Sequence, residues 1–208
     1  MDIRDVGKVL NAIGEKTVYV DGRLEQVPSP YEDYYLLKEE KGKWEYGVFK
    51  RYMKNTPYFQ KEKTFDTREE GSRFFFLDRL SSYYSLTVVH PLLARKDLHI
   101  YDDTFDVSKL RYALSVAGVS KDLFYVDQKP SHRAVVLESK GTDCIISFFG
   151  TSGNKVSSSL PLELHRALFF TFQSVVKLHL FETEVSMFLK QENVAVTFTD
   201  EEIDFFIS

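Results

Sequence analysis

The chain has 208 residues, a formal net charge of −4 at pH 7, and a composition that is 43% hydrophobic and 15% aromatic. This composition excludes a disordered chain, which would be polar and poor in aromatic residues, and it predicts a buried core. No apolar run reaches the roughly 20 residues of a membrane-spanning helix, and residues 1–14 lack the apolar core of a secretory signal. The single cysteine, Cys144, permits no internal disulfide, which agrees with a reducing compartment. We therefore expect a cytoplasmic protein that does not bind membranes, with Cys144 as a buried strand thiol.

The first predicted elements are a helix and a short hairpin. Apolar residues recur at helical spacing from Asp2 to Ile13, and Gly14 follows as a C-terminal stop. The segments TVYV and RLEQV then flank Asp21-Gly22, a dipeptide that favours the type I′ turn of a two-residue hairpin. Pro28 ends this hairpin, because proline cannot donate a hydrogen bond to a strand ladder.

Three further strands are predicted between Tyr34 and Phe65. The segments YYLLKEE and KWEYGVFK are rich in aromatic and branched residues, and they flank a Lys41-Gly42 turn that glycine can close at positive φ. Tyr58 to Phe65 supplies the third strand. The pattern therefore predicts a hairpin extended by a third strand.

A capped helix follows these strands. Asp66 and Glu69 have the spacing of an N-cap residue and its N3 partner, and the helix is expected to run to about Ser82. Pro91 interrupts the next helix-compatible stretch, so the structure of residues 83–94 stays open.

The second half of the chain predicts a similar series of elements. Asp97 to Phe105 is interpreted as a short strand and turn, and Asp106 as the N-cap of a helix that ends at Ala117. A Lys140-Gly141 turn between AVVLES and CIISFFG predicts another hairpin. A long helix is expected after Pro161, because proline is tolerated in a first helical turn.

The two halves also match in detail. The segment Tyr19 to Asp21 is echoed by Tyr125 to Asp127, 106 residues later, and the Lys41-Gly42 turn by Lys140-Gly141, 99 residues later. The first helix and its glycine stop are repeated 104 residues later, where Ile3, Val6, Leu10, Ile13 and Gly14 correspond to Val107, Leu110, Leu114, Ala117 and Gly118.

We therefore predict an α+β fold made by tandem duplication. Each unit contains a helix, about four antiparallel strands and a second helix, and the two units are expected to pack as a pseudo-dimer. The first repeat covers residues 1–96, and the second covers residues 97–208 with an acidic C-terminal extension. Because amphipathic helices that end in glycine are common, chance similarity of the two halves stays as an alternative.

The C-terminal extension concentrates the negative charge of the chain. The segment VAVTFT at residues 194–199 is interpreted as a possible edge strand, and Thr199 with Glu202 as the capping box of a last short acidic turn. Between Glu182 and Ser208 there are seven acidic residues and one lysine, whereas Lys38 to Arg68 has an excess of basic residues. Each cluster is either a binding surface or simply a solvated face.

No motif of a known catalytic or metal site stands out. His165 and His179 share a stripe of the long helix, but the helical rise separates them by about 21 Å. Gly150 to Lys155 lacks the residue order of a phosphate-binding loop and is interpreted as a turn between strands. Asp102 and Asp103 lack the closing glutamate of a calcium loop. We expect no catalytic residue, no cofactor and no metal.

Aromatic and basic residues interleave around Trp44 to Arg51, a pattern that can bind single-stranded nucleic acid by stacking. Strand alternation puts Trp44, Tyr46 and Val48 on one face, which is the pattern of a core. The net negative charge also argues against nucleic-acid binding. We therefore expect no nucleic-acid partner.

One stretch of the chain resembles a known class of proteins. The order YYLLKEEKGKWEYGVF at residues 34–49, a further strand, and FDTREE at residues 65–70 opening an aromatic helix resemble small immunity proteins of bacterial polymorphic toxin systems. The resemblance covers mainly residues 33–82. It implies a cytoplasmic protein that binds and blocks one cognate toxin domain by protein–protein contact, without a cofactor. The resemblance assigns a role to no individual residue.

The charge pattern then suggests where a toxin would bind. Because many such toxins are basic nucleases, the acidic segment is the first candidate, since its carboxylates can take the place of substrate phosphates. The candidate partner-binding residues are Glu192, Asp200, Glu201, Glu202, Asp204 and Phe205, with Tyr101, Asp102 and Asp103 as a second group. Two other functions stay open: a secretion chaperone or adaptor, and an enzyme whose site forms only in three dimensions.

Overall fold

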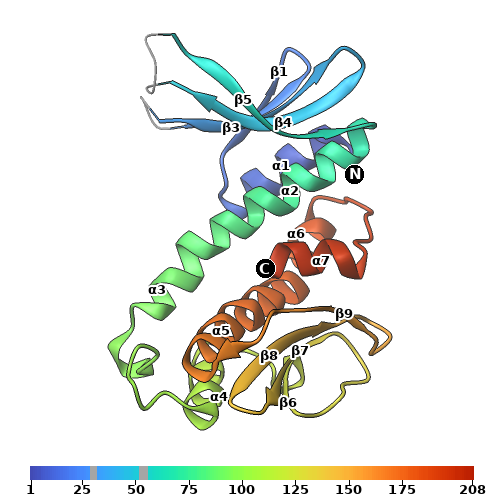
Figure 1. Cartoon of the computed structure of the whole chain (residues 1–208). Coiled ribbons are helices and arrows are strands. Elements are labelled where there is room, and N and C mark those ends of the chain that lie inside the picture. The colour runs from blue at the N-terminus through green and yellow to red at the C-terminus, as the bar shows by residue number, and fades with distance from the viewer. Residues whose placement is uncertain (29–31, 52–55) are drawn as a thin grey trace. The chain divides into compact units, whose positions relative to one another are not determined.

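The computed structural model describes residues 1–28, 32–51 and 56–208 (Figure 1). It divides the chain into two compact units, of which unit 1 comprises Met1–Leu80 with Val185–Val196, and unit 2 comprises Ser81–Glu184 with Thr197–Ser208. Each unit contains a β-sheet and several helices, so the predicted α+β fold is confirmed. Within the described ranges, no helix is long and apolar enough to cross a lipid bilayer.

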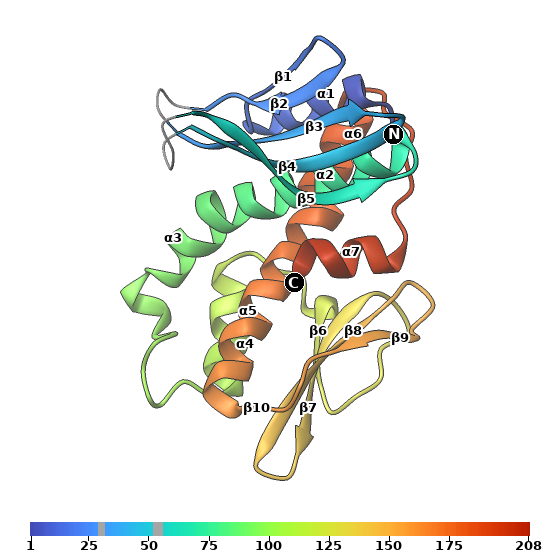
Figure 2. The ribbon, with the colours of Figure 1, turned by 45° about the horizontal axis from the view of Figure 1, so that its top comes forward.

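Unit 1 is an antiparallel sheet with helices on one face. Figures 1 and 2 show α1 and α2 on the same side of the sheet. The strands lie in chain order, β1-β2-β3-β4-β5. The elements are α1 (Ile3–Ile13), β1 (Thr17–Val20), β2 (Arg23–Gln26), β3 (Tyr34–Glu40), β4 (Lys43–Lys50), β5 (Tyr58–Phe65), most of α2 (Arg68–Tyr84), and α6 (Ser186–Gln191).

Local sequence signals account for several boundaries in unit 1. The Asp2 side chain accepts a hydrogen bond from the backbone nitrogen of Arg4 and caps α1, and Gly14 ends the helix with φ of 116°. Both residues of the Asp21-Gly22 turn have positive φ, and so do both residues of the Lys41-Gly42 turn. Two-residue type I′ turns require this conformation, so both predicted hairpins of unit 1 are confirmed.

The capping box of α2 lies one residue later than its sequence pattern suggested. Glu70 N donates to Thr67 Oγ1 at 3.2 Å, and Thr67 N donates to Glu70 Oε2 at 3.2 Å. Thr67 and Glu70 therefore form the capping box, and the prediction of Asp66 and Glu69 was wrong. Asp66 instead pairs with Lys43 across the start of β4.

Unit 2 repeats the helix and sheet with changes in its strands. Its long helix α5 contacts β7 and β8, while α4 packs against α5 and α7 against β9. The strand order is β10-β8-β7-β6, with β9 also paired to β8. The elements are α3 (His90–Leu93), α4 (Val107–Val116), β6 (Phe124–Val126), β7 (Ala134–Lys140), β8 (Asp143–Phe149), β9 (Lys155–Ser158), β10 (Leu162–Glu163), α5 (Leu164–Leu180) and α7 (Asp200–Ile207).

The first helices of the two repeats end in the same way. Glu15 N donates to Leu10 O, and Val119 N donates to Leu114 O, each across the helix end to the fifth residue back. Both donors and both acceptors are 104 residues apart, as are the glycines at positive φ that make these bonds possible, Gly14 and Gly118. The sequence match of the two helices is therefore also a match of their geometry.

The central hairpins of the repeats correspond with an offset of 100 residues. Tyr34 pairs with Phe49 and Leu37 with Tyr46 in the first sheet, and Ala134 pairs with Phe149 and Leu137 with Ile146 in the second. The predicted offset of 99 residues was wrong, because Gly42 is the second residue of its turn whereas Gly141 is the first.

The long second helices match at an offset of 96 residues. α2 and α5 both have 17 residues, and each continues into a π-helical segment of five residues, Ser85–Val89 and Phe181–Val185. Thr87 and Thr183 occupy equivalent positions, and both hydroxyls donate to the carbonyl four residues back at 2.7 Å. Residues 83–94, left open by the sequence pattern, are therefore mostly helical, with the wider π turn preceding Pro91.

One strand pairing differs between the repeats. In the first sheet β2 lies between β1 and β3 and is antiparallel to both, so β1 and β3 run in the same direction. In the second sheet residues 127–133 form no strand, and β6 pairs directly with β7 in parallel. Without a counterpart of β2, β6 keeps the direction of β1 and moves next to β7. The prediction of purely antiparallel strands therefore fails at this pair.

Three other predicted elements were wrong. Residues Asp97 to Phe105 form a 3-10 turn and bends instead of a strand, and His99 has φ of 54°. Residues 194–199 form no strand, although the capping box of Thr199 and Glu202 is present and begins α7. Pro161 precedes the short strand β10, so it is not in the first turn of α5.

The compact units divide the chain at other positions than the predicted repeat boundary at residues 96 and 97. The end of the helical run that begins with α2 belongs to unit 2, and α6, which follows α5, belongs to unit 1. The repeat boundary describes copies of a sequence and the units describe contacts, so the boundary stays a prediction. The packing of the repeats as a pseudo-dimer also stays a prediction.

The capping box of α2 gives a test of this description. Replacing Thr67 with alanine removes the oxygen that accepts from Glu70 N, and we expect a loss of about 1 kcal/mol in the free energy of unfolding. The matched control is Asp66→Ala, which removes only an exposed ion pair and should destabilise the protein less than Thr67→Ala does. Urea unfolding of both variants measures the difference. A larger loss for Asp66→Ala would contradict the assignment.

Candidate functional site

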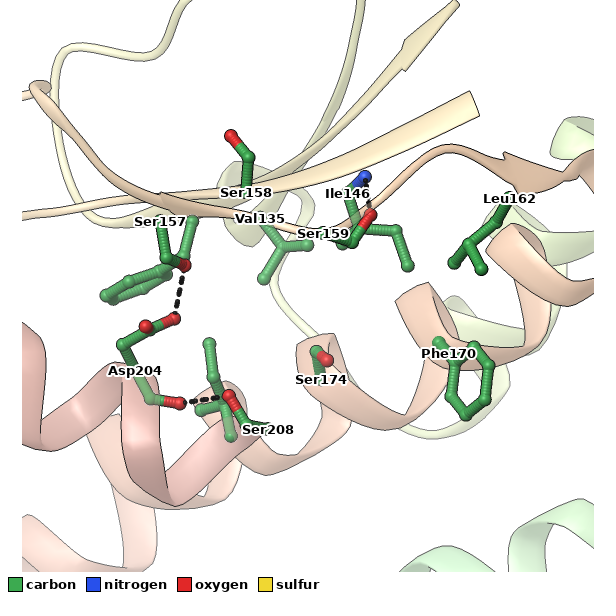
Figure 3. A pocket seen from close by; sticks show the side chains of 12 residues that line it. Val135, Ile146, Ser157, Ser158, Ser159, Leu162, Phe170, Ser174, Asp204 and Ser208 are labelled. Atoms are coloured by element: carbon green, nitrogen blue, oxygen red, sulfur yellow. Dashed lines mark hydrogen bonds between the residues drawn. The ribbon is translucent and has the colours of Figure 1, made fainter. Parts of the chain in front are cut away.

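A hollow of about 510 Å³ opens in unit 2 between the inner face of the second sheet and the helices α5 and α7 (Figure 3). Figure 3 shows Asp204 and Ser157 at one end of the hollow, and Leu162 and Phe170 at the other. Phe170 is 40% exposed, which places the second end at the surface. The hollow is lined by Val135, Ile146, Phe148, Ser157, Ser158, Ser159, Leu162, Phe170, Ser174, Asp204, Ile207 and Ser208.

An interrupted edge strand forms one wall of the hollow. β9 and β10 both pair with β8, but the chain leaves the ladder between Ser158 and Leu162. At the break Ser159 N donates to Ile146 O at 2.8 Å, and Ile146 N donates to Ser159 Oγ at 3.0 Å. A serine hydroxyl therefore replaces a strand carbonyl, and the following Leu160 is left 82% exposed.

The same layer is filled in the first repeat. There the ring of Tyr46 on β4 is only 1% exposed, and its hydroxyl donates to Asp78 on α2. Burial raises the pKa of Tyr46, so its hydroxyl stays protonated and acts as a donor. The counterparts at offsets of 100 and 96 residues are Ile146 and Ser174, and both line the hollow. Two smaller side chains thus occupy the positions of a tyrosine and an aspartate.

Asp204 supplies the carboxylate of the hollow. Its Oδ1 atom accepts a hydrogen bond from Ser157 Oγ at 2.6 Å, and its backbone oxygen accepts from Ser208 Oγ at 2.7 Å (Figure 3). The bond from Ser157 holds the carboxylate against β9 through Oδ1. The second carboxylate oxygen, Oδ2, takes no part in this bond. One predicted partner-binding residue therefore lines the hollow.

A strip of three aromatic residues, Tyr101, Phe169 and Phe170, leads from the hollow to the second predicted group. The ring centroids of Tyr101 and Phe169 are 5.8 Å apart, and those of Phe169 and Phe170 are 5.5 Å apart. Tyr101 is 63% exposed. We call these three residues the aromatic strip.

The surface next to the aromatic strip is not purely acidic. Asp102 and Asp103 are exposed, as a binding role requires. Oδ2 of Asp102 lies 2.7 Å from Nδ1 of His99, and Arg95 and Lys96 line the same surface hollow as Tyr101. The surface around Tyr101 therefore mixes charges of both signs.

Asp200 has a structural role in unit 2. Its carboxylate accepts hydrogen bonds from Arg133 Nε at 3.1 Å, from the backbone nitrogen of Thr151 at 3.0 Å, and from Thr151 Oγ1 at 3.1 Å. Arg133 also pairs with Glu182. Burial raises the pKa of Asp200, but the bonds from Arg133 and Thr151 outweigh burial and hold this pKa below its usual value. The network ties the turn after β8 to the start of α7.

The remaining predicted residues of the acidic segment do not line the hollow. Glu202 belongs to the capping box of α7, while Glu201 and Phe205 are exposed on that helix. Glu192 follows α6 and belongs to unit 1. Phe206, the neighbour of Phe205, is fully buried against Tyr84 and Phe181. Among the carboxylates predicted in the acidic segment, Asp204 is the one that lines the hollow.

The residues that the sequence pattern missed are those that shape the hollow. Phe170, Ser174 and the serines 157–159 were not among the candidates. A comparison of the two repeats was the available signal, because Phe74 in the first repeat corresponds to Phe170 and is packed against Tyr46 and Phe65. The sequence did not indicate that Phe170 is exposed while its counterpart Phe74 packs against other rings.

A buried lysine lies on the same helix as Ser174. Lys177 is 6% exposed and donates to Ser81 Oγ at 3.1 Å and to the backbone oxygen of Ser208 at 2.9 Å. Burial lowers the pKa of Lys177 to about 8. Charged Lys177 therefore destabilises the folded state at neutral pH.

Metal-ligating side chains do not gather within residues 1–28, 32–51 and 56–208. No three His, Cys, Asp or Glu side chains there come together as a metal site requires. Cys144 is buried in β8, as predicted, and burial raises the pKa of its thiol. Comparisons with models of protein families, with curated proteins and with solved structures found no match.

Replacing Asp200 separates structural from exposed carboxylates. Asp200→Ala leaves Arg133 and Thr151 without their shared acceptor, and we expect a loss of about 2 to 3 kcal/mol in the free energy of unfolding. The control Glu201→Ala on the same helix turn should change stability by less than about 0.5 kcal/mol. Urea unfolding measures both. Equal, small losses would show that the network does not stabilise unit 2.

The burial of Lys177 predicts a specific pH dependence. Its pKa falls from an ordinary value near 10.5 to about 8 on folding, so between these values the unfolded chain binds more protons and stability rises with pH. From pH 7.5 to 9.5 the free energy of unfolding should rise by about 2 kcal/mol more than in Lys177→Met. Urea unfolding at both pH values tests this, with the exposed Lys140→Met as control. The same pH slope in Lys177→Met and the native chain would refute it.

Proposed function

We propose that the chain is a cytoplasmic immunity protein that binds a cognate bacterial toxin domain and neutralises it by protein–protein contact. The observation that carries the proposal is the continuous surface of unit 2 that joins Asp102, the aromatic strip and the hollow with Asp204. The resemblance of residues 33–82 to immunity proteins supports the same function. The protein acts without catalysis or a cofactor in this proposal.

The composition of this surface supports protein binding. Exposed aromatic residues carry much of the binding energy of protein interfaces, because they bury large apolar areas with little loss of conformational freedom. Three exposed apolar side chains, Leu160, Leu164 and Phe170, lie on or next to the wall of the hollow. An interface of standard size covers about 800 Å² per partner, which leaves room for the strip, the hollow and the carboxylates around them.

In this proposal the acidic residues have two different roles. The carboxylates of Asp200 and Glu202 accept hydrogen bonds that stabilise the start of α7, so we assign them a structural role. Glu201 and the carboxylates at Asp102 and Asp103 are exposed and can steer a basic partner toward the surface. We therefore assign steering to the exposed carboxylates and the main binding energy to the aromatic strip and the hollow.

A secretion chaperone or adaptor is the second candidate function. Such a protein would bind a segment that is disordered in its free form, whereas an immunity protein binds a folded domain. Limited proteolysis of the isolated partner distinguishes the two, because a disordered client segment is cleaved rapidly when it is free. The open hollow and exposed leucines are compatible with either partner.

Co-expression with the neighbouring reading frame tests the proposed function. The domain encoded next to this chain should inhibit bacterial growth when it is expressed alone, and growth should recover when the two are co-expressed. Tyr101→Ala, which truncates the exposed aromatic strip, should weaken the purified complex at least about tenfold. The control is Met187→Ala, since Met187 is also a large exposed apolar residue but lies on α6 of unit 1. Unrelieved growth inhibition without a complex would rule out the proposal.

A charge variant tests the assigned role of the acidic residues. Glu201→Lys should slow association at low salt and leave dissociation nearly unchanged, because exposed charges act mainly on the association rate. Surface plasmon resonance at low and physiological ionic strength measures both rates. An unchanged association rate at low salt would remove Glu201 from the steering surface.

A further inference from the structure

The side chains between the hairpin and the long helix differ between the two repeats. In the first repeat the space is filled by the phenol ring of Tyr46, whose hydroxyl donates to the carboxylate of Asp78. In the second repeat Ile146 and Ser174 occupy the corresponding positions, and a hollow of about 510 Å³ is present. The first repeat therefore shows which chemical group fits between such a hairpin and such a helix.

The second repeat still offers a carboxylate to this space, but from another element. Asp204 comes from α7, which has no counterpart in the first repeat, and it lines the hollow at the end opposite Phe170 (Figure 3). Ser157 holds the carboxylate through Oδ1 at 2.6 Å. A hydroxyl that reaches this end can donate to the other carboxylate oxygen, as Tyr46 donates to Asp78.

The walls between the two ends suit a ring. Val135, Ile146 and Phe148 present apolar side chains from the sheet, and Phe170 presents an aromatic ring from α5. An aromatic side chain that enters past Phe170 would contact these apolar groups, with Ser159 and Ser174 beside them, and would meet a hydrogen-bond acceptor at its tip. The hollow therefore offers apolar side chains to the ring of a phenol and a carboxylate to its hydroxyl.

We propose that the hollow of unit 2 is a binding site for a tyrosine side chain of the partner protein. The partner's phenol ring lies between β8 and α5, in the layer that corresponds to the one containing Tyr46 in the first repeat, and its hydroxyl donates to Asp204. The source of the tyrosine rests on the proposed function, whereas the recognition of a phenol rests on the geometry of unit 2 alone. The second copy of the duplicated unit has thus exchanged an internal tyrosine for one supplied by a partner.

Titration with small probes tests the site directly. We expect p-cresol, which carries the phenol of tyrosine, to shift the amide NMR resonances of Ser157 to Ser159 and of Ser174 in a saturable manner. Toluene, which lacks the hydroxyl, should bind about tenfold more weakly. Stronger binding of n-butylammonium than of p-cresol would indicate a lysine-type occupant and overturn the proposal, as would equal binding of toluene.

Two variants and a control make the test specific. Ile146→Tyr combined with Ser174→Asp rebuilds the filled pair of the first repeat and should abolish the shifts caused by p-cresol. Asp204→Asn keeps the shape of the hollow, and it should reduce the preference for p-cresol over toluene at least about fivefold, so it tests the site even if the double variant fails to fold. Ile145→Tyr adds the same ring on the opposite face of β8 and should leave binding unchanged.

Binding by small probes is independent of any partner, so the two proposals can fail separately. Saturable binding of p-cresol without relief of toxin-induced growth inhibition would retain the site and reject the immunity function. Relief of growth inhibition with no saturable shift up to the solubility limit of p-cresol would retain the function and reject the site.

Discussion

The packing of one long helix against the inner face of each sheet is the constraint on which both units depend. In unit 1 the hydrogen-bonded pair of Tyr46 and Asp78 lies in the layer between β4 and α2. Arg79 lies over the ring of Tyr35 with its guanidinium carbon 3.5 Å from the ring centroid, and it also pairs with Asp78. Buried polar groups of this kind stabilise a fold only when they are paired, so this network fixes the helix on the sheet.

The second unit keeps the backbone of this arrangement and changes its side chains. The equivalent helix α5 contacts β7 and β8, and it has the same length and the same π-helical continuation as α2. Ile146 and Ser174 replace the tyrosine and aspartate, and the edge strand beside them is interrupted at Ser159. The framework is thus held constant while one layer is opened. In a duplicated protein such a difference between copies is the natural place for a function that one copy lacks.

Sequence reasoning predicted the parts of the fold that short-range chemistry determines. Gly14 and Gly118 end their helices, and Gly22 and Gly42 help to close hairpins, because glycine adopts positive φ at little energetic cost. The cap of α2 was placed one residue too early, since Asp66 and Thr67 are both good N-cap residues with a glutamate three positions later. The parallel pairing of β6 with β7 was not predictable, because it depends on residues 127–133 failing to form a strand.

The candidate site followed the same division between local and tertiary effects. Charge alone selected the acidic segment, yet Asp200 and Glu202 hold the start of α7, and Asp204 is the member that lines the hollow. Their different roles depend on Arg133, Thr151 and Ser157, which are distant in sequence. Phe170 was missed because its exposure depends on the interrupted edge strand. Sequence patterns identified the carboxylates, and the fold distinguishes those that stabilise α7 from the one that lines the hollow.

Hydrogen exchange of the complex with the proposed toxin domain tests the central claim most directly. We expect binding to protect the backbone amides of residues 155–174, which include β9, β10 and the start of α5, together with the loop at residues 99–103. The strands of the first sheet, β1 to β5, should exchange as they do in the free protein. Protection confined to the first sheet, with residues 155–174 unchanged, would contradict the claim that the opened layer of the second repeat is the binding site.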